Sequence, residues 1–258
     1  MSIDDGQAES GTGLGRLLAV GDIHGCAEEL SALLREVDPS ERDTIVFLGD
    51  YVDRGDGSRE VIDQLLELRT SNRCRTIFLR GNHEDMFLDF LGEDGSHGDV
   101  FLFNGGRATL ASYGVRPGAK LSDVLAALPP AHLTFLRELT FSHVVEPFLF
   151  VHAGISPLRA LADQQREDLL WIRDEFIRNR HRLKQTVVFG HTPQREVFWH
   201  LPYKVGLDTG CVYGNRLSCL DFTSRVLLQA ERGSCRIHRG AVPAELPTLS
   251  TSASEPTP

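Results

Sequence analysis

The chain has 258 residues, 41% of them hydrophobic, which is enough for one large domain with a substantial core. Its formal charge at pH 7 is −9, and the central part stays acidic when the acidic ends are left out. Because binding to nucleic acids and to anionic membranes depends on clustered Lys and Arg, the composition argues against both classes of partner.

The two ends of the chain differ in composition from the rest. Residues 1–15 are rich in Gly, Ser and acidic residues, and residues 241–258 in Pro, Ser and Thr, so both are predicted to be disordered tails around a folded domain at residues 16–240. The first residues lack the basic and apolar segments of a signal peptide, and no apolar run approaches the ~20 residues that span a bilayer. We therefore expect a cytoplasmic protein, and the sequence indicates no particular oligomeric state.

Strands and helices alternate in the first third of the folded region. Short, β-prone apolar runs at residues 17–20, 44–48 and 76–79 predict strands. Between the first two, the i, i+3, i+4, i+7 spacing of apolar residues predicts a helix, carried by Leu30, Leu33, Leu34 and Val37. This alternation predicts right-handed crossovers and a mostly parallel sheet.

The pattern changes in the rest of the chain. Residues 92–140 predict a largely helical insertion that contains several glycines. Strand-like runs follow, several of them close enough to pair antiparallel, at residues 148–151, 186–189, 204–207, 217–222 and 226–229. The predicted fold is α/β, with two mixed sheets packed face to face and flanked by helices.

Five cysteines are spread along the chain without a CxxC pair, at Cys26, Cys74, Cys211, Cys219 and Cys235. The odd number and wide spacing favour reduced thiols packed as small apolar groups over disulfides or a zinc cluster. Cys26 alone is a candidate for mild reactivity, because it follows a glycine where a helix is predicted to begin and a helix N-terminus favours the thiolate.

Each of the first three predicted strands ends in a glycine-flanked polar block: GDIHG at 21–25, GDYVDRG at 49–55 and RGNHE at 80–84. Ligands collect at the carboxyl ends of the strands in parallel α/β sheets, so these blocks are expected to converge in space. Two later strands end in His152 (VHAG) and His191 (GHTP). A single Asp before a helix is more often an N-cap, and a single strand-end His more often a structural residue. Five such blocks at five strand ends point instead to one site.

These strand ends supply carboxylates, imidazoles and an amide oxygen, without a thiolate. The donor set suits Mn(II), Fe or Zn better than Ca(II) or a structural zinc. The residues are Asp22, His24, Asp50, Asn82, His83, His152 and His191.

In this order, GDIHG, GDYVDRG, RGNHE, VHAG and GHTP resemble the PPP-type metallophosphoesterases, and most closely the small bacterial and phage Ser/Thr phosphatases of the lambda-phosphatase type. The resemblance runs from about residue 17 to residue 222 and implies a calcineurin-like αββα sandwich. It also implies two divalent metal ions that share Asp50, expected to be manganese, with iron or zinc as alternatives. One ion would be bound by Asp22, His24 and Asp50, and the other by Asp50, Asn82, His152 and His191.

The resemblance further implies a direct in-line attack on phosphorus by a hydroxide held between the two metals, without a phosphoenzyme. His83 would protonate the leaving alkoxide and would be held as imidazolium by Asp53. Arg54 and Arg173 would bind the phosphate, because a planar guanidinium matches two oxygens at once.

Three functions remain open. The first is a Ser/Thr protein phosphatase, the second a symmetrical dinucleoside tetraphosphate hydrolase, and the third a non-catalytic phosphate-binding scaffold. Asp53 and Glu84 favour the phosphatase, because the tetraphosphatases generally lack the acid of the DRG block and carry GNHD, whereas DTGCVYGNRL at 208–217 is similar to a tetraphosphatase segment. The expected partner is a phosphorylated protein or peptide, or a small phosphoester. The insertion at 92–118 is expected to border the cleft.

Overall fold

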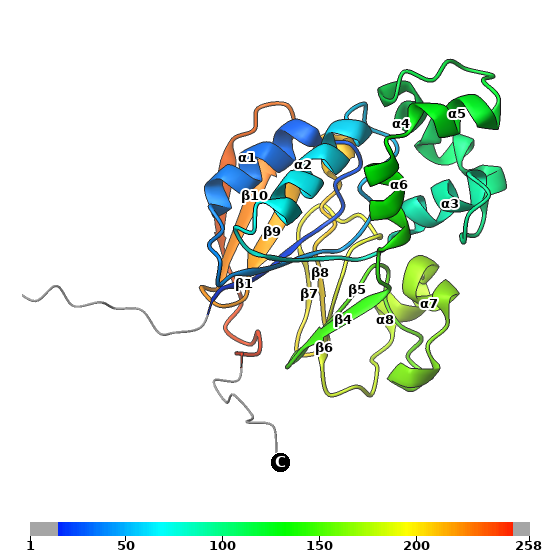
Figure 1. The fold of residues 1–258 in the computed structure, drawn as a ribbon. Helices are drawn as coiled ribbons and strands as arrows, with labels where there is room; N and C mark the ends of the chain where they lie inside the picture. The colour runs from blue at the N-terminus through cyan, green and yellow to red at the C-terminus, as the bar shows by residue number, and fades with distance from the viewer. Residues whose placement is uncertain (1–14, 250–258) are drawn as a thin grey trace, which may run out of the picture.

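The fold consists of two mixed β-sheets packed face to face, as a computed structural model shows for residues 15–249 (Figure 1). The first sheet has the strand order β11-β10-β9-β1-β2-β3, in which β1, β2 and β3 are parallel and the others pair antiparallel. Its strands are β1 (Leu17–Val20), β2 (Thr44–Phe47), β3 (Arg75–Phe78), β9 (Arg216–Asp221), β10 (Val226–Glu231) and β11 (Ile237–Ala241).

The second sheet has the order β4-β5-β6-β8-β7, with a parallel centre of β5, β6 and β8 between two antiparallel edge strands. Its strands are β4 (Ser142–Val145), β5 (Phe148–Val151), β6 (Thr186–Phe189), β7 (Phe198–His200) and β8 (Lys204–Gly206). The expectation of two mixed sheets is confirmed. The short strands β4, β7 and β11 were not predicted.

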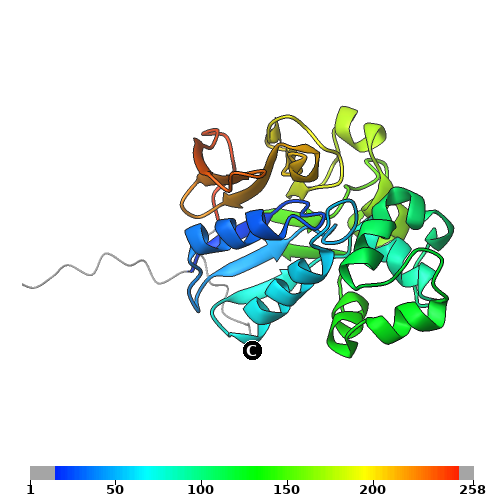
Figure 2. The same cartoon turned by 90° about the horizontal axis from the view of Figure 1, so that it is seen from above.

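Helices cover the outer faces of the sandwich (Figures 1 and 2). Over the first sheet lie α1 (Ala27–Val37) and α2 (Ser58–Thr70), and beside the second sheet lie α7 (Arg166–Trp171) and α8 (Asp174–Arg178). The insertion is largely helical, as predicted, and forms a group at one end with α3 (Asn82–Phe90), α4 (Arg107–Ser112), α5 (Leu121–Ala127) and α6 (Pro130–Arg137). Short turns of helix are η1 (Gly98–Val100), η2 (Leu102–Gly106), η3 (Leu161–Asp163) and η4 (Cys211–Tyr213).

The alternation of side chains along the strands produces three apolar layers. Leu18 and Val20 of β1 pack under α1 and α2, whereas Leu17 and Ala19 face the second sheet. In β5, the even-numbered residues Phe148 and Phe150 pack against Leu17 and Ala19 between the sheets. The odd-numbered residues Leu149 and Val151 pack against α8. Two sheets whose outer faces are both covered by helices form an αββα sandwich. In both sheets the carboxyl ends of the parallel strands point to the site described below.

The folded region extends further toward the C-terminus than predicted. Ala241 is the last residue of β11, and Leu246 is 2% exposed in the core between the sheets. The Arg225 guanidinium donates to the carbonyl oxygens of Pro243 and Leu246. Val242 and Leu249 also pack against this core, so the apolar residues of a Pro- and Thr-rich stretch attach it to the domain beyond residue 240. Residues 1–14 and 250–258 of the two predicted tails lie outside the described residues.

The helices within residues 15–249 include no candidate for a membrane span. None of them is long and apolar enough to cross a bilayer.

An ion pair joins the start of β1 to the loop before β2 and predicts a stability effect. Burial opposes ionisation of Asp43, but its bonds to the Arg16 guanidinium and to backbone N–H groups hold the pKa of Asp43 at about 2. The stabilisation is therefore fully present above the ordinary Asp pKa and is lost as pH falls toward 2. We expect Asp43→Asn to lower the free energy of unfolding by about 1–3 kcal/mol at pH 7.

Urea unfolding measures this effect, and the difference between the two proteins should narrow as pH falls from 5 toward 2. The control is Asp38→Asn, which removes an exposed ion pair with Arg73 and should cost about 0–1 kcal/mol. Equal losses for the two variants would contradict the assignment.

Candidate metal centre

The polar residues that follow β1, β2, β3, β5 and β6 form one connected network. Since β5 and β6 belong to the second sheet, the network joins the carboxyl ends of both sheets. It contains all ten predicted site residues, which are Asp22, His24, Asp50, Asp53, Arg54, Asn82, His83, His152, Arg173 and His191. All except the two arginines are buried.

One group of candidate ligands lies where β1, β2 and β3 end. Single ligand atoms of His24, Asp50 and His83 lie within 4.8 Å of one another, and His24 Nε2 is 3.4 Å from Asp50 Oδ2. Asp22 is not in this group, and both its oxygens accept the backbone N–H of His191, at 2.9 and 3.1 Å. The structure thus places His83 beside His24 and Asp50, where the resemblance implied Asp22.

A second group lies between the two sheets. Ligand atoms of Asp50, His152 and His191 lie within 4.8 Å of one another, and His152 Nε2 is 3.4 Å from Asp50 Oδ1. The amide oxygen of Asn82 is 3.0 Å from His152 Nε2 and 2.9 Å from His191 Nδ1. Asp50 therefore contributes one oxygen to each group, which is the position expected of a bridging carboxylate.

The hydrogen bonds of two imidazole rings indicate that these groups are suited to bind cations. His24 Nδ1 lies 2.8 Å from the carbonyl oxygen of Val52, and His152 Nδ1 lies 2.8 Å from that of Leu48, so in both rings Nδ1 carries the proton. Burial lowers the pKa of both histidines and keeps the rings neutral. The Nε2 lone pair of His152 then faces two acceptors, the Asp50 carboxylate and the Asn82 amide oxygen, whereas His24 Nε2 faces Asp50 and also contacts Arg54 Nη1. Acceptors that face acceptors in a buried site are stabilised by a positive ion between them.

Glycines bring the backbone close to these carboxylates. A Cβ on Gly190 would overlap Asp22 Oδ1, and one on Gly81 would overlap Asp50 Oδ1. Several site residues also have positive φ, a conformation that costs about 1–2 kcal/mol for a residue other than glycine. They are His24, Asp50, Asp53, Arg54 and His191. Strain gathered at one place is typical of a functional site.

The contact at Gly190 predicts a loss of metal affinity. Gly190→Ala should push the Asp22 carboxylate away from the backbone N–H of His191, disturb the position of His191 and weaken metal binding about 10–100-fold, with little change in secondary structure. Manganese titration calorimetry measures the binding. The matched control is Gly240→Ala, whose Cβ meets Leu227 at ordinary contact distances. Unchanged metal binding in Gly190→Ala would refute the role of Asp22.

Glu84 holds the loops of the site together. Its carboxylate is fully buried and accepts four backbone N–H groups, those of Asp50, Tyr51, Val52 and Gly81, at 2.7–3.2 Å. These bonds fix the backbone on which Asp50 sits. The sequence of the GNHE motif gives no sign of this structural role of Glu84.

His83 and Asp53 form a buried pair next to the candidate metal ligands. His83 Nδ1 is 2.6 Å from Asp53 Oδ2, and the Thr109 hydroxyl donates to Asp53 Oδ1 at 2.6 Å. Burial opposes protonation of His83, but the charge of Asp50 and the bond to Asp53 together raise the pKa of His83. The pair suits a general acid. Thr109 comes from α4, so the insertion contributes directly to the site.

The two arginines converge on the same centre from different sides. An Arg54 Nη1 atom contacts His24 Nε2, and Arg173 Nη1 donates to the His191 carbonyl at 3.0 Å. A further buried carboxylate, Asp208, feels the charges of both arginines: burial raises the pKa of Asp208 to about 6, and Arg54 and Arg173 oppose this rise. The strand-end position of Asp208 after β8 could have identified it, as it identified the other site residues.

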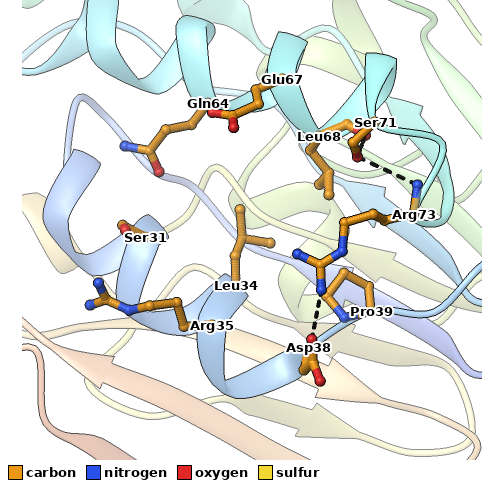
Figure 3. Close-up of a pocket in the computed structure, with 10 residues that line it drawn as sticks. All are labelled: Ser31, Leu34, Arg35, Asp38, Pro39, Gln64, Glu67, Leu68, Ser71 and Arg73. Carbon is orange, nitrogen blue, oxygen red and sulfur yellow. Dashed lines mark hydrogen bonds and ion pairs between the residues drawn. The ribbon is translucent and has the colours of Figure 1, made fainter.

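A pocket of about 350 Å³ lies elsewhere, between α1 and α2 (Figure 3). Leu34 and Leu68 form its floor, and the charged side chains of Arg35, Asp38 and Arg73 surround it. None of the ten predicted site residues lines it, so this pocket is not the candidate centre.

Comparison with known proteins decides the family. The family model described as calcineurin-like phosphoesterase matches residues 15–226. The chain belongs to the calcineurin-like phosphoesterase family. Members of this family use a dinuclear metal centre, and the two overlapping groups around Asp50 are the candidate ligands here. The resemblance to PPP-type phosphoesterases is confirmed.

Curated relatives of this phosphoesterase carry two different activities in their names. The chain is 33% identical over 210 residues to serine/threonine-protein phosphatase 1 of Salmonella typhimurium, which covers 77% of this chain and 88% of that protein. It is 25% identical over 227 residues to the asymmetrical bis(5'-nucleosyl)-tetraphosphatase PrpE of Anoxybacillus flavithermus, covering 79% and 89%.

Solved structures share the phosphoesterase fold. A putative diadenosine tetraphosphatase superposes with a TM-score of 0.59 at 24% identity, over 90% of this chain and 96% of that one. A protein serine/threonine phosphatase from Saccharomyces cerevisiae superposes with a TM-score of 0.53 at 17% identity, over 90% and 81%. At these identities the likeness supports the fold and leaves the substrate open.

Proposed function

We propose that this phosphoesterase is a metal-dependent phosphomonoesterase that removes phosphate from phosphoserine and phosphothreonine. The observation that carries the proposal is the buried His83–Asp53 pair with its 2.6 Å hydrogen bond. An alkoxide of Ser or Thr is a poor leaving group and needs a proton as it departs. The phosphate anion that leaves a dinucleoside tetraphosphate is far less basic than an alkoxide and has less need of a proton from a general acid.

The metal ligands follow from the two groups around Asp50. We assign Asp22, His24 and Asp50 to one ion, and Asp50, Asn82, His152 and His191 to the other, with manganese as the first choice and iron or zinc as alternatives. Asp22 is included because it holds the backbone of His191 and lies beside Asp50. Two divalent cations bound there would supply the positive charge that attracts phosphate and would activate a water for attack on phosphorus.

The chain's own residues perform the remaining tasks. Arg54 and Arg173 each present a planar guanidinium that can grip two phosphate oxygens and hold the ester in one orientation. Asp53 fixes the His83 ring through Nδ1, with Thr109 fixing Asp53 in turn, so that His83 Nε2 delivers its proton to the departing oxygen. The third function, a non-catalytic scaffold, is disfavoured because all of these groups are present together.

The test is an assay of manganese-loaded protein on a phosphothreonine peptide and on diadenosine tetraphosphate, side by side. We expect the larger kcat/KM for the peptide. A large preference for the dinucleotide would overturn the proposal in favour of the second function.

Two exposed aromatic rings favour dinucleoside tetraphosphate hydrolysis as the second candidate. Tyr213 is 61% exposed, and the Arg54 guanidinium lies over its ring at 5.6 Å. Phe103 is 82% exposed in η2, where the Gly105 carbonyl accepts the backbone N–H of Arg54. Aromatic rings on two loops that meet at a phosphate-binding arginine are suited to stack on a nucleobase.

Substitution of the two rings separates the candidates. If the second function is correct, Tyr213→Ala and Phe103→Ala should each lower kcat/KM for diadenosine tetraphosphate about tenfold, the effect of one lost stacking contact. Turnover of phosphothreonine by the same variants should change less than twofold. An equal loss on both substrates would assign the rings to the structure of the site and not to base recognition.

A further inference from the structure

A pair of buried cysteines lies next to the candidate metal centre. Single ligand atoms of Cys26, Cys211 and Glu29 lie within 4.8 Å of one another, so the two sulfurs are direct neighbours. All three residues are buried. The two cysteines are 185 positions apart in the sequence, and the fold brings them together because β9 pairs with β1.

The pair connects two loops of the site. Cys26 is two residues after His24, and its thiol faces the His24 carbonyl at 3.8 Å. Cys211 is the first residue of η4, which begins three residues after Asp208 and ends at Tyr213. A covalent bond between the two sulfurs would therefore tie the loop of one candidate metal ligand to the loop that contacts Arg54.

The groups around Cys26 and Cys211 favour a disulfide over a bound metal ion. Glu29 is already satisfied, since its carboxylate accepts from Arg232 Nη1 at 2.7 Å and from the Gly233 N–H at 2.8 Å. A divalent ion would have to displace the Arg232 guanidinium and then remain next to it. A disulfide is neutral and leaves the ion pair of Glu29 and Arg232 intact.

We propose that Cys26 and Cys211 are a site of reversible disulfide formation. A peroxide is the oxidant by class. One thiol gives up its proton as it attacks the O–O bond of hydrogen peroxide and becomes a sulfenic acid with release of water, and the second thiol displaces the sulfenic oxygen as a second water. Two thiols are oxidised, one peroxide is reduced to two waters, and one S–S bond forms.

A pocket open to solvent lies beside the cysteine pair. It has a volume of about 350 Å³ and is lined by the two neighbours of Cys26, Gly25 and Ala27, and by Arg232, which pairs with Glu29. Neither cysteine lines this pocket, so hydrogen peroxide that enters it reaches the buried thiols only when the structure opens locally.

Disulfide formation should change the geometry of the site. The two sulfurs must approach to about 2.05 Å. Cys26 is held at the start of α1, whereas η4 is short and lies between Gly210 and Gly214, both with positive φ. We therefore expect η4 to move and to carry Tyr213 away from Arg54. The expected loss of activity rests on the proposed phosphoesterase function, whereas formation of the disulfide does not.

The test treats the purified full-length protein with millimolar hydrogen peroxide, blocks the remaining thiols and maps tryptic peptides without reduction. We expect a dithiothreitol-sensitive link between peptides 17–35 and 205–216, which contain Cys26 and Cys211. Absence of this link, or cross-linking mainly through Cys235, would overturn the proposal.

Activity is then measured before and after peroxide, with metal resupplied. The wild type should lose at least five-fold in turnover and recover with dithiothreitol, whereas Cys26→Ser and Cys211→Ser should each keep most of their own starting activity. The control Cys74→Ser alters a buried thiol outside the pair and should respond like the wild type. Equal inactivation of Cys26→Ser and the wild type would refute control of the site by this disulfide.

Discussion

Replacement of Asp50 by asparagine is expected to lower kcat/KM by about 10³-fold or more, since loss of metal assistance removes several kcal/mol of transition-state stabilisation. The two oxygens of Asp50 lie 3.4 Å from His24 Nε2 and 3.4 Å from His152 Nε2, one in each ligand group. Asparagine has the same shape but replaces one of these oxygens with an NH₂ group that cannot bind a cation. Both metal sites should therefore weaken together.

The measurement for Asp50→Asn is metal content after dialysis, by plasma mass spectrometry, together with turnover of a phosphothreonine peptide. Asp38→Asn, which alters an exposed carboxylate, should keep the metal content and activity of the wild type. Retention of two ions per chain by Asp50→Asn would contradict the bridging assignment.

Replacement of His83 by asparagine is expected to lower turnover of phosphothreonine by about 10²–10⁴-fold, the usual contribution of a general acid. The pKa of His83 is raised by the charge of Asp50 and the bond to Asp53 against the effect of burial, so the ring is held ready to donate. Hydrolysis of p-nitrophenyl phosphate should fall much less, because p-nitrophenolate leaves without a proton.

The comparison of the two substrates is the readout for His83. Asp53→Asn should show the same selectivity, because Asp53 Oδ2 fixes the His83 ring. Asp63→Asn serves as control, since Asp63 pairs with a different buried histidine, His132, outside the site. Equal losses on both substrates in His83→Asn would assign His83 to metal binding, where its place beside His24 and Asp50 also allows it.

The sequence predicted the gathering of the site residues because strand ends converge in a parallel sheet. Each of the strands β1, β2, β3, β5 and β6 has a site residue within four positions of its end, so position along the chain determined position in space. The second sheet contributed His152 and His191 by the same rule.

Other parts of the site have no such local signal. Thr109 reaches Asp53 from a helix 56 residues further along the chain, and no periodicity indicates that contact. Glu84 acts on backbone N–H groups, which any sequence at residues 50–52 would provide. The proximity of Cys26 and Cys211 depends on the pairing of β1 with β9. These contacts arise from tertiary packing, which spacing within one segment does not encode.

The central claim is that two metal ions bind at the ends of the two sheets and share Asp50. A crystal structure of the manganese-loaded protein, with an anomalous difference map measured at the manganese edge, tests it most directly. We expect two peaks, one on each side of Asp50, the first next to His24 and the second next to Asn82, His152 and His191. A single peak, or peaks away from Asp50, would contradict it.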